Sequence, residues 1–203
     1  MATNTLDARG VPPSYKQDAA KVEQVRATLA GLRQQVQEAT GTRQATQKEA
    51  TAAQEELRRM EDRRVELTAK ANAVKVAVGQ AVLAGADEMQ EGARMAGVDA
   101  AISALEPSLR RARRNVAIAT LNDQEAHYRQ LEVQVAERDT LSGLHYLEAL
   151  ALRAEQERRD GVSYLRPPAA NQDYDAQNWR VQVSQLRGEV EQRRLRLDRD
   201  FPL

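Results

Sequence analysis

Hydrophobic residues recur every seven positions through the first part of the chain. Counting from Val22, gaps of three and four residues alternate for roughly nine heptads, more than the three or four that indicate a coiled coil. The pattern predicts one long helix over residues 18–84 that buries a narrow seam. The seam comprises an a series (Val22, Leu29, Val36, Arg43, Ala50, Leu57, Arg64, Ala71, Val78) and a d series (Val25, Leu32, Ala39, Thr46, Ala53, Met60, Leu67, Val74, Ala81).

The seam is small and polar between residues 39 and 53, where Ala, Arg and Thr replace Leu and Val. Small side chains let paired helices approach closely but contribute little apolar burial. One interpretation is a locally narrow or loose coil. The other is a bend, or a place where a third helix docks.

A second long helix is predicted over residues 108–160, and its apolar pattern drifts. The drift predicts a stutter near residues 136–141, and Gly161 is the type of residue that follows a helix end. The apolar positions are Leu109, Ala112, Val116, Leu121, Tyr128, Leu131, Val135, Leu141, Leu144, Leu147 and Leu152.

Between these helices the chain becomes rich in glycine and alanine. We predict a hairpin tip or hinge over residues 85–107, in which Gly85, Gly92 and Gly97 supply backbone freedom. Pro107 would then begin the returning helix, because proline is tolerated in a first helical turn. The alternative is a helix that runs on and is interrupted only at Pro107.

The remaining segments flank this hairpin. Residues 1–17 contain a Pro-Pro pair and predict an extended arm, and residues 161–174 predict an extended strap. Residues 175–200 predict a last helix with an apolar stripe: Trp179, Val183, Leu186, Val190 and Leu197. The predicted fold is therefore all-α: a long antiparallel helical hairpin or coiled coil with an additional C-terminal helix and an extended N-terminal arm.

Composition supports thin helix pairs over a thick core. Aromatic residues make up 3% of the 203 residues and charged residues 30%, whereas large cores draw much of their buried area from aromatic side chains. The heptads leave open whether the first helix pairs within its own chain or with another copy, and the Ala-rich seam does not fix a number of copies.

Neither the net charge nor any targeting signal in the sequence indicates a particular partner or cellular compartment. The 30 basic and 30 acidic residues cancel, so there is no overall attraction to nucleic acid or anionic membrane. The N-terminus lacks a classical secretion signal, and no stretch reaches the roughly 18 apolar residues of a membrane span. We expect a cytoplasmic protein, or a virion protein if the gene belongs to a phage.

The residue types needed for most catalytic sites are missing or scattered. The chain has no cysteine and no phosphate-binding glycine loop or nucleophile motif. Its two histidines, His127 and His145, do not occur in the Glu-x-x-His pattern of carboxylate-bundle metal sites. We therefore expect no enzyme activity, no metal and no cofactor.

Two surfaces are candidates for binding. The basic cluster Arg110, Arg111, Arg113 and Arg114 could contact nucleic-acid phosphates, although pairing with acids such as Glu88 and Glu91 is the favoured interpretation. The patch over residues 77–97 could form an apolar face, but its acidic polar side disfavours anionic lipid and favours protein packing.

A role in assembly fits these patterns best. We expect a structural coiled-coil protein that acts as a spacer or connector, with protein partners or further copies of itself. A bacteriophage connector, internal core or scaffold-like component is one form, and a cytosolic coiled-coil adaptor another. Trp179, Tyr174 and Tyr164 are the aromatic candidates for partner contact. Trp179 could equally fasten the last helix to the hairpin.

Overall fold

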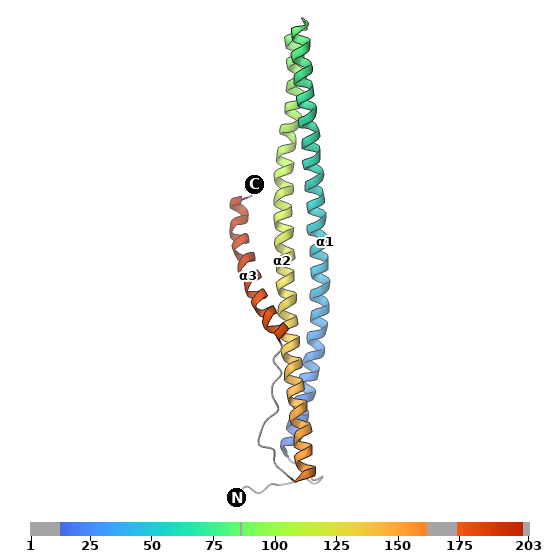
Figure 1. Cartoon of the computed structure of the whole chain (residues 1–203), viewed down its shortest axis with the longest axis vertical. Coiled ribbons are helices and arrows are strands. Elements are labelled where there is room, and N and C mark those ends of the chain that lie inside the picture. Colours follow the sequence, from blue (N-terminus) through green and yellow to red (C-terminus); the bar gives the residue numbers. More distant parts are fainter. Residues whose placement is uncertain (1–12, 86, 162–173, 201–203) are drawn as a thin grey trace. The chain divides into compact units, whose positions relative to one another are not determined.

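The computed structural model describes residues 13–85, 87–161 and 174–200. These residues form three helices, α1 (Pro13–Leu83), α2 (Glu88–Asp160) and α3 (Tyr174–Asp200) (Figure 1). Helices α1 and α2 form an antiparallel hairpin within one chain, and α3 follows α2. The predicted all-α fold is confirmed. The fold also answers the pairing question left open by the heptads, because α1 packs against α2 of its own chain.

The heptad prediction for α1 is confirmed almost residue by residue. Between Ala20 and Gly85, every buried or half-buried residue occupies a predicted a or d position, except Thr40 and Val82 in adjoining positions. Arg64 is the one predicted seam position in this stretch that stays exposed. A long charged side chain at a seam position can keep its head group in water while its aliphatic part lies along the helix pair. The Arg64 guanidinium lies 3.0 Å from the Glu106 carboxylate of α2.

Contacts divide the described chain into two compact units. The first contains α1 up to Arg43, α2 from Ala126 and α3 up to Gly188, and the second contains the remainder of each helix. In the first unit, Val22, Leu29 and Leu144 form a buried cluster, with Val25, Leu141 and Leu147 packed against it.

Helix α2 carries two interleaved heptad series, so the predicted stutter near residues 136–141 is wrong. One series faces α1; its buried members are Leu109, Ala112, Ala126, Gln130 and Leu144. The other faces α3; it includes Leu121, Gln124, Tyr128, Leu131 and Arg138. The apparent drift in the sequence arises because a helix with two neighbours superimposes two regular stripes.

Helix α3 has the predicted stripe and begins one residue earlier than expected. Its buried residues are Ala176 and Val190; Trp179, Val183 and Leu186 between them, and Leu197 beyond them, are half-buried at heptad spacing. Side-chain contacts place this stripe on α2 within each unit: Trp179 meets Arg138 in the first, and Leu197 lies beside Leu121 in the second.

The turn between α1 and α2 is much shorter than the predicted tip over residues 85–107. It consists of Ala84, Gly85 and the residues up to Asp87, with Gly85 at a φ of 89°. Asp87 caps α2, since its carboxylate accepts a hydrogen bond from the Met89 N–H at 2.9 Å. Gly92 and Gly97, predicted as hinge residues, lie inside α2.

Pro107 also lies inside α2 and does not begin it. Its side chain is on an exposed face, where the carbonyl that loses its helical partner remains accessible to water. The alternative prediction, a helix that continues through this segment, is therefore the better one. Its expected interruption at Pro107 is wrong, because α2 continues through that residue. At the other end, α1 already begins at Pro13, so the predicted arm over residues 1–17 extends too far. Proline suits this position because a first-turn N–H has no helical acceptor.

The described helices are too polar to span a membrane. No helix among them contains an apolar stretch long enough to cross a bilayer. The predicted strap over residues 161–174 lies outside the described residues, apart from Gly161 and Tyr174 at its two ends.

Candidate interaction sites

Three arginines spaced by seven residues connect α3 to α2. In the first unit, Arg180 contacts the Asp139 carboxylate at 2.5 Å and Arg187 pairs with Glu132. In the second unit, the next arginine of the series, Arg194, contacts Glu125 at 2.6 Å. The acids are also spaced by seven residues in the reverse direction, so the pairs fix the antiparallel register of α3. Sequence reasoning missed this series, although its spacing is visible in the sequence.

The aromatic candidates for partner contact fall in different places. Trp179 is half-buried, and the Arg138 guanidinium lies 5.7 Å from its ring centroid, a cation–π contact between α2 and α3. The structure thus gives Trp179 a packing role within the chain, and its contact with a partner stays a prediction. Tyr174 is the first residue of α3, and Tyr164 lies outside the described residues.

A polar network interrupts the α1–α2 seam in the first unit. Arg43 donates to the Gln130 side-chain oxygen at 3.0 Å, and the Gln130 amide nitrogen donates to the Thr40 hydroxyl at 2.9 Å. In the second unit, the Thr46 hydroxyl donates to Asp123 at 3.3 Å. The small and polar middle of the seam is therefore a set of matched hydrogen bonds between the two helices.

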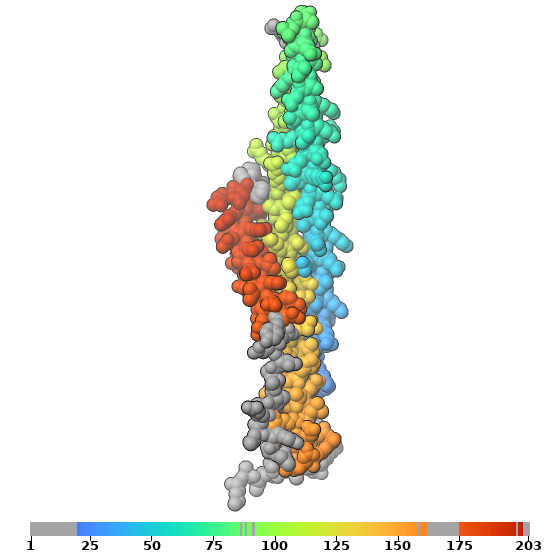
Figure 2. All heavy atoms as spheres, in the orientation of Figure 1, coloured from blue at the N-terminus to red at the C-terminus, as the bar shows by residue number. Residues whose placement is uncertain are grey.

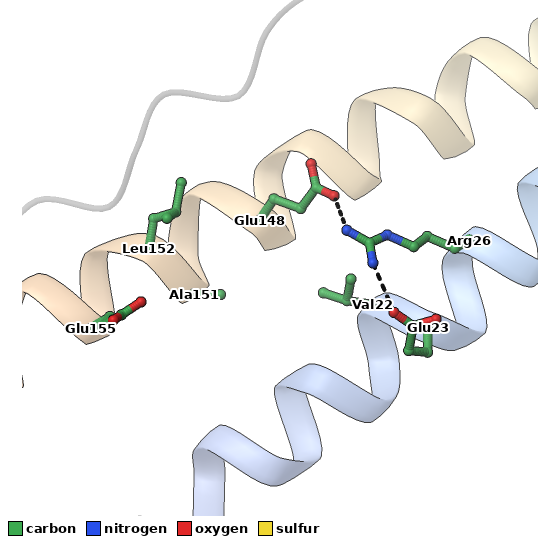
Figure 3. Close-up of a pocket in the computed structure, with 7 residues that line it drawn as sticks. All are labelled: Val22, Glu23, Arg26, Glu148, Ala151, Leu152 and Glu155. Carbon is green, nitrogen blue, oxygen red and sulfur yellow. Dashed lines mark hydrogen bonds and ion pairs between the residues drawn. The ribbon is translucent and has the colours of Figure 1, made fainter.

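A groove of about 450 Å³ lies between α1 and α2 in the first unit (Figure 3). Val22, Ala151 and Leu152 form its apolar part, and Figure 3 shows the Arg26 guanidinium between the Glu23 and Glu148 carboxylates, each at 2.8 Å. Hydrogen bonds to Glu148 and then Glu23 raise the pKa of Arg26 above its ordinary value. The groove thus has an apolar part beside a polar rim, in which one guanidinium is shared by two carboxylates.

The four arginines of the basic cluster have two different surroundings. Arg113 is directed to α1, where it contacts the Glu61 carboxylate at 3.2 Å. Arg110, Arg111 and Arg114 lie within one turn of one another on the face of α2 that carries the α3-facing series. The expected pairing with Glu88 and Glu91 is wrong, because about 30 Å of continuous helix separates them from the cluster.

A second groove, of about 270 Å³, adjoins this arginine-bearing face in the second unit. Ala117, Thr120 and Leu121 of α2 form one side. Arg193, Arg196, Leu197 and Asp200 of α3 form the other. Because Ala117 is one helical turn from Arg114, the groove continues directly into the arginine cluster.

The Gly/Ala-rich patch over residues 77–97 divides between seam and surface. Val78 is buried, and Ala81 and Met95 are half-buried in the α1–α2 seam, as expected for protein packing. Leu83 and Met89, on either side of the turn, are 90% and 86% exposed. The patch thus packs the hairpin end and leaves two large apolar side chains in contact with solvent.

The acidic and histidine side chains of the described residues are scattered along the helices. Among the described residues, no cluster of three or more histidine or acidic side chains has suitable geometry. His145 is exposed, and His127 is half-buried on α2 with an interaction partner. Comparison with known proteins assigns no family: the chain matches no protein-family model, no curated protein and no solved structure.

Proposed function

We propose that this chain is a non-enzymatic structural protein that acts as a spacer or connector in a larger assembly. The observation that supports this proposal is the seam of α1, in which nearly all buried side chains occupy a and d positions over nearly the whole helix. The buried side chains of α1 hold two helices in register, and its other faces are largely polar, with Val65, Val76 and Leu83 as exposed exceptions. A protein selected for length and rigidity needs this arrangement.

The polar contacts between helices support the same proposal. Arg33–Glu137, Arg43–Gln130 and Arg113–Glu61 connect α1 and α2 at successive levels. Exposed ion pairs add little stability individually, typically about 0.2–1 kcal/mol. Their larger effect is to disfavour shifted registers, which would place like charges together. A connector of constant length requires one register.

A matched deletion tests whether length is the function. Removing residues 64–70 from α1 and 100–106 from α2 takes out one heptad on each side of the seam, including both members of the Arg64–Glu106 pair. The hairpin should keep its register and lose about 10 Å of length. We expect the variant to remain folded by circular dichroism and to fail when it replaces the native gene.

The control replaces the same two segments with heptads of equal length and shuffled surface residues, which leaves length and seam intact. This control should retain function. Full function in the shortened variant would overturn the spacer proposal. Loss of function in both variants would show that surface residues in these segments act directly.

The number of copies separates the two forms of the proposal. A bacteriophage connector, core or scaffold component should form a symmetric oligomer, whereas a cytosolic adaptor can act as a monomer with a different partner. Light scattering after size exclusion measures the absolute mass. A defined trimer, hexamer or dodecamer would support the virion form, and the 22.6 kDa monomer would support the adaptor.

A further inference from the structure

We propose that the second unit carries a nucleic-acid-binding surface formed by five arginines, Arg110, Arg111 and Arg114 of α2 with Arg193 and Arg196 of α3. This surface is called the arginine face below. It would bind the phosphate backbone of duplex nucleic acid without reading base sequence. The proposal goes beyond the spacer function and does not depend on it.

The first observation is that three of these cations have no partner among the residues that the structure describes. No hydrogen bond or ion pair joins Arg110, Arg111 or Arg196 to another residue in the part of the chain that the structure describes. The neighbouring arginines are engaged: Arg113 with Glu61, and Arg194 with Glu125. Arg110, Arg111 and Arg196 are exposed, so their guanidinium groups are accessible to an external anion.

The second observation is where α3 ends. The contacts Arg194–Glu125 and Arg193–Gln124 place the C-terminal turns of α3 beside the part of α2 near residue 120. The α3-facing series of α2 continues beyond that point through Ala117 to Arg114 and Arg110. The groove beside Arg196 therefore connects the arginines of α3 to those of α2 in one surface. Figure 2 shows the red C-terminal part of α3 beside the yellow-green part of α2.

The third observation is an electrostatic cost. Arg110 and Arg114 are four positions apart, and Arg111 and Arg114 three, so like charges lie across one helical turn, although Arg114 also has a partner within the chain. Like charges at this spacing destabilise a helix by roughly 0.2–0.5 kcal/mol per pair. A bound polyanion would remove this repulsion, because each phosphate supplies a negative charge and guanidinium groups bind phosphate oxygens in bidentate geometry.

Duplex nucleic acid fits the surface better than the other polyanions do. The exposed face of α2 that precedes the cluster carries small residues, including Ala100, Ser103 and Ala104. A rigid duplex can approach such a surface closely. A membrane would require several large apolar side chains beside the arginines. The exposed Leu195 adjoins Arg196, but Leu83 and Met89 at the turn lie several helical turns away.

The test measures binding of the full chain to a fluorescein-labelled duplex of mixed sequence by fluorescence anisotropy. With three to four phosphates neutralised, affinity should fall roughly 40- to 150-fold between about 50 and 200 mM salt. The triple variant Arg110→Gln, Arg111→Gln, Arg196→Gln should bind at least about 30-fold more weakly and show a shallower salt dependence.

A matched control removes the same charge from the same unit. Lys48, Lys70 and Lys75 are exposed on α1, and their triple Gln variant should bind within about 3-fold of the unaltered chain if affinity depends on local phosphate contacts. Equal losses in both variants would overturn the proposal, because net charge would then explain binding. Wild-type affinity in the arginine variant would also overturn it.

Competition experiments distinguish the other ligands. Inorganic phosphate at matched ionic strength should not displace the duplex; complete displacement would indicate a single-anion site and overturn the proposal. Binding to poly-glutamate or to phosphatidylserine vesicles with no binding to the duplex would assign the surface to an acidic protein or a membrane instead. Absence of duplex binding at the lowest salt would overturn the proposal outright.

Discussion

Arg43 of α1 donates a hydrogen bond to the side-chain oxygen of Gln130 of α2, with 3.0 Å between the two atoms. Gln130 is 8% exposed, and its amide nitrogen donates to Thr40, so both ends of the carboxamide have partners within the seam. A polar pair in the seam contributes less to stability than a buried apolar pair would. It also fixes the register of α1 against α2, because any shifted register would bury these polar groups without their partners.

Separating this pair should destabilise the first unit. In the variant Gln130→Leu, the Arg43 guanidinium loses one of its hydrogen bonds, and the Thr40 hydroxyl keeps only its bond to the Val36 carbonyl, so we expect a cost of about 1 kcal/mol in unfolding free energy. The double variant Arg43→Leu, Gln130→Leu should recover that loss or exceed the stability of the unaltered chain. Urea unfolding monitored by circular dichroism measures both. A single variant as stable as the unaltered chain would contradict this account.

The sequence predicts α1 well because that helix has one neighbour. Its 3.5-residue period follows directly from packing against a single partner, and even polar members such as Arg43 and Thr46 occupy the predicted positions. Helix α2 was harder to predict because Leu121 and Leu131 pack toward α3 while Leu109 and Leu144 pack toward α1. A single periodic template cannot describe both stripes.

The hairpin tip was predicted too long because local residue preferences were weighted above packing. Gly92, Gly97 and Pro107 each disfavour helix, but seam contacts on either side of them hold α2 together. The candidate binding sites were likewise only partly predictable from the sequence. The arginine cluster was found from the sequence, whereas its continuation onto Arg196 of α3 depends on the register of a third helix.

Replacing Pro107 with alanine should stabilise the second unit. The ring removes one backbone donor inside α2, and alanine restores that hydrogen bond at an exposed position where no packing is lost, so we expect a gain of about 2–3 kcal/mol. The reciprocal variant Ala100→Pro, on the same exposed face, should lose a similar amount. Differential scanning calorimetry measures both changes; an unchanged melting temperature in Pro107→Ala would show that α2 is already distorted there.

Two glycines should respond to alanine in opposite directions. Gly85 has a φ of 89°, which strains any residue with a Cβ, so Gly85→Ala should cost about 1–2 kcal/mol. Gly92 lies in α2 with open space around an added Cβ, and Gly92→Ala should gain about 1 kcal/mol. Thermal unfolding of the two variants under identical conditions tests the short turn. If both substitutions stabilise the chain, the turn does not lie at Gly85.

Exchanging the charges of one pair tests the register of α3. Asp139 and Arg180 are both about half-exposed and lie 2.5 Å apart, so Arg180→Asp should place two carboxylates together and weaken α3 docking by about 1 kcal/mol. Adding Asp139→Arg to the same chain should restore most of the loss. The single tryptophan, Trp179, precedes Arg180 and is half-buried against α2, so its fluorescence reports the docking of α3. The loss should shrink in 0.5 M salt, where the Debye length is about 4–5 Å. A double variant as weak as the single one, or a loss independent of salt, would show that the pair does not set the register.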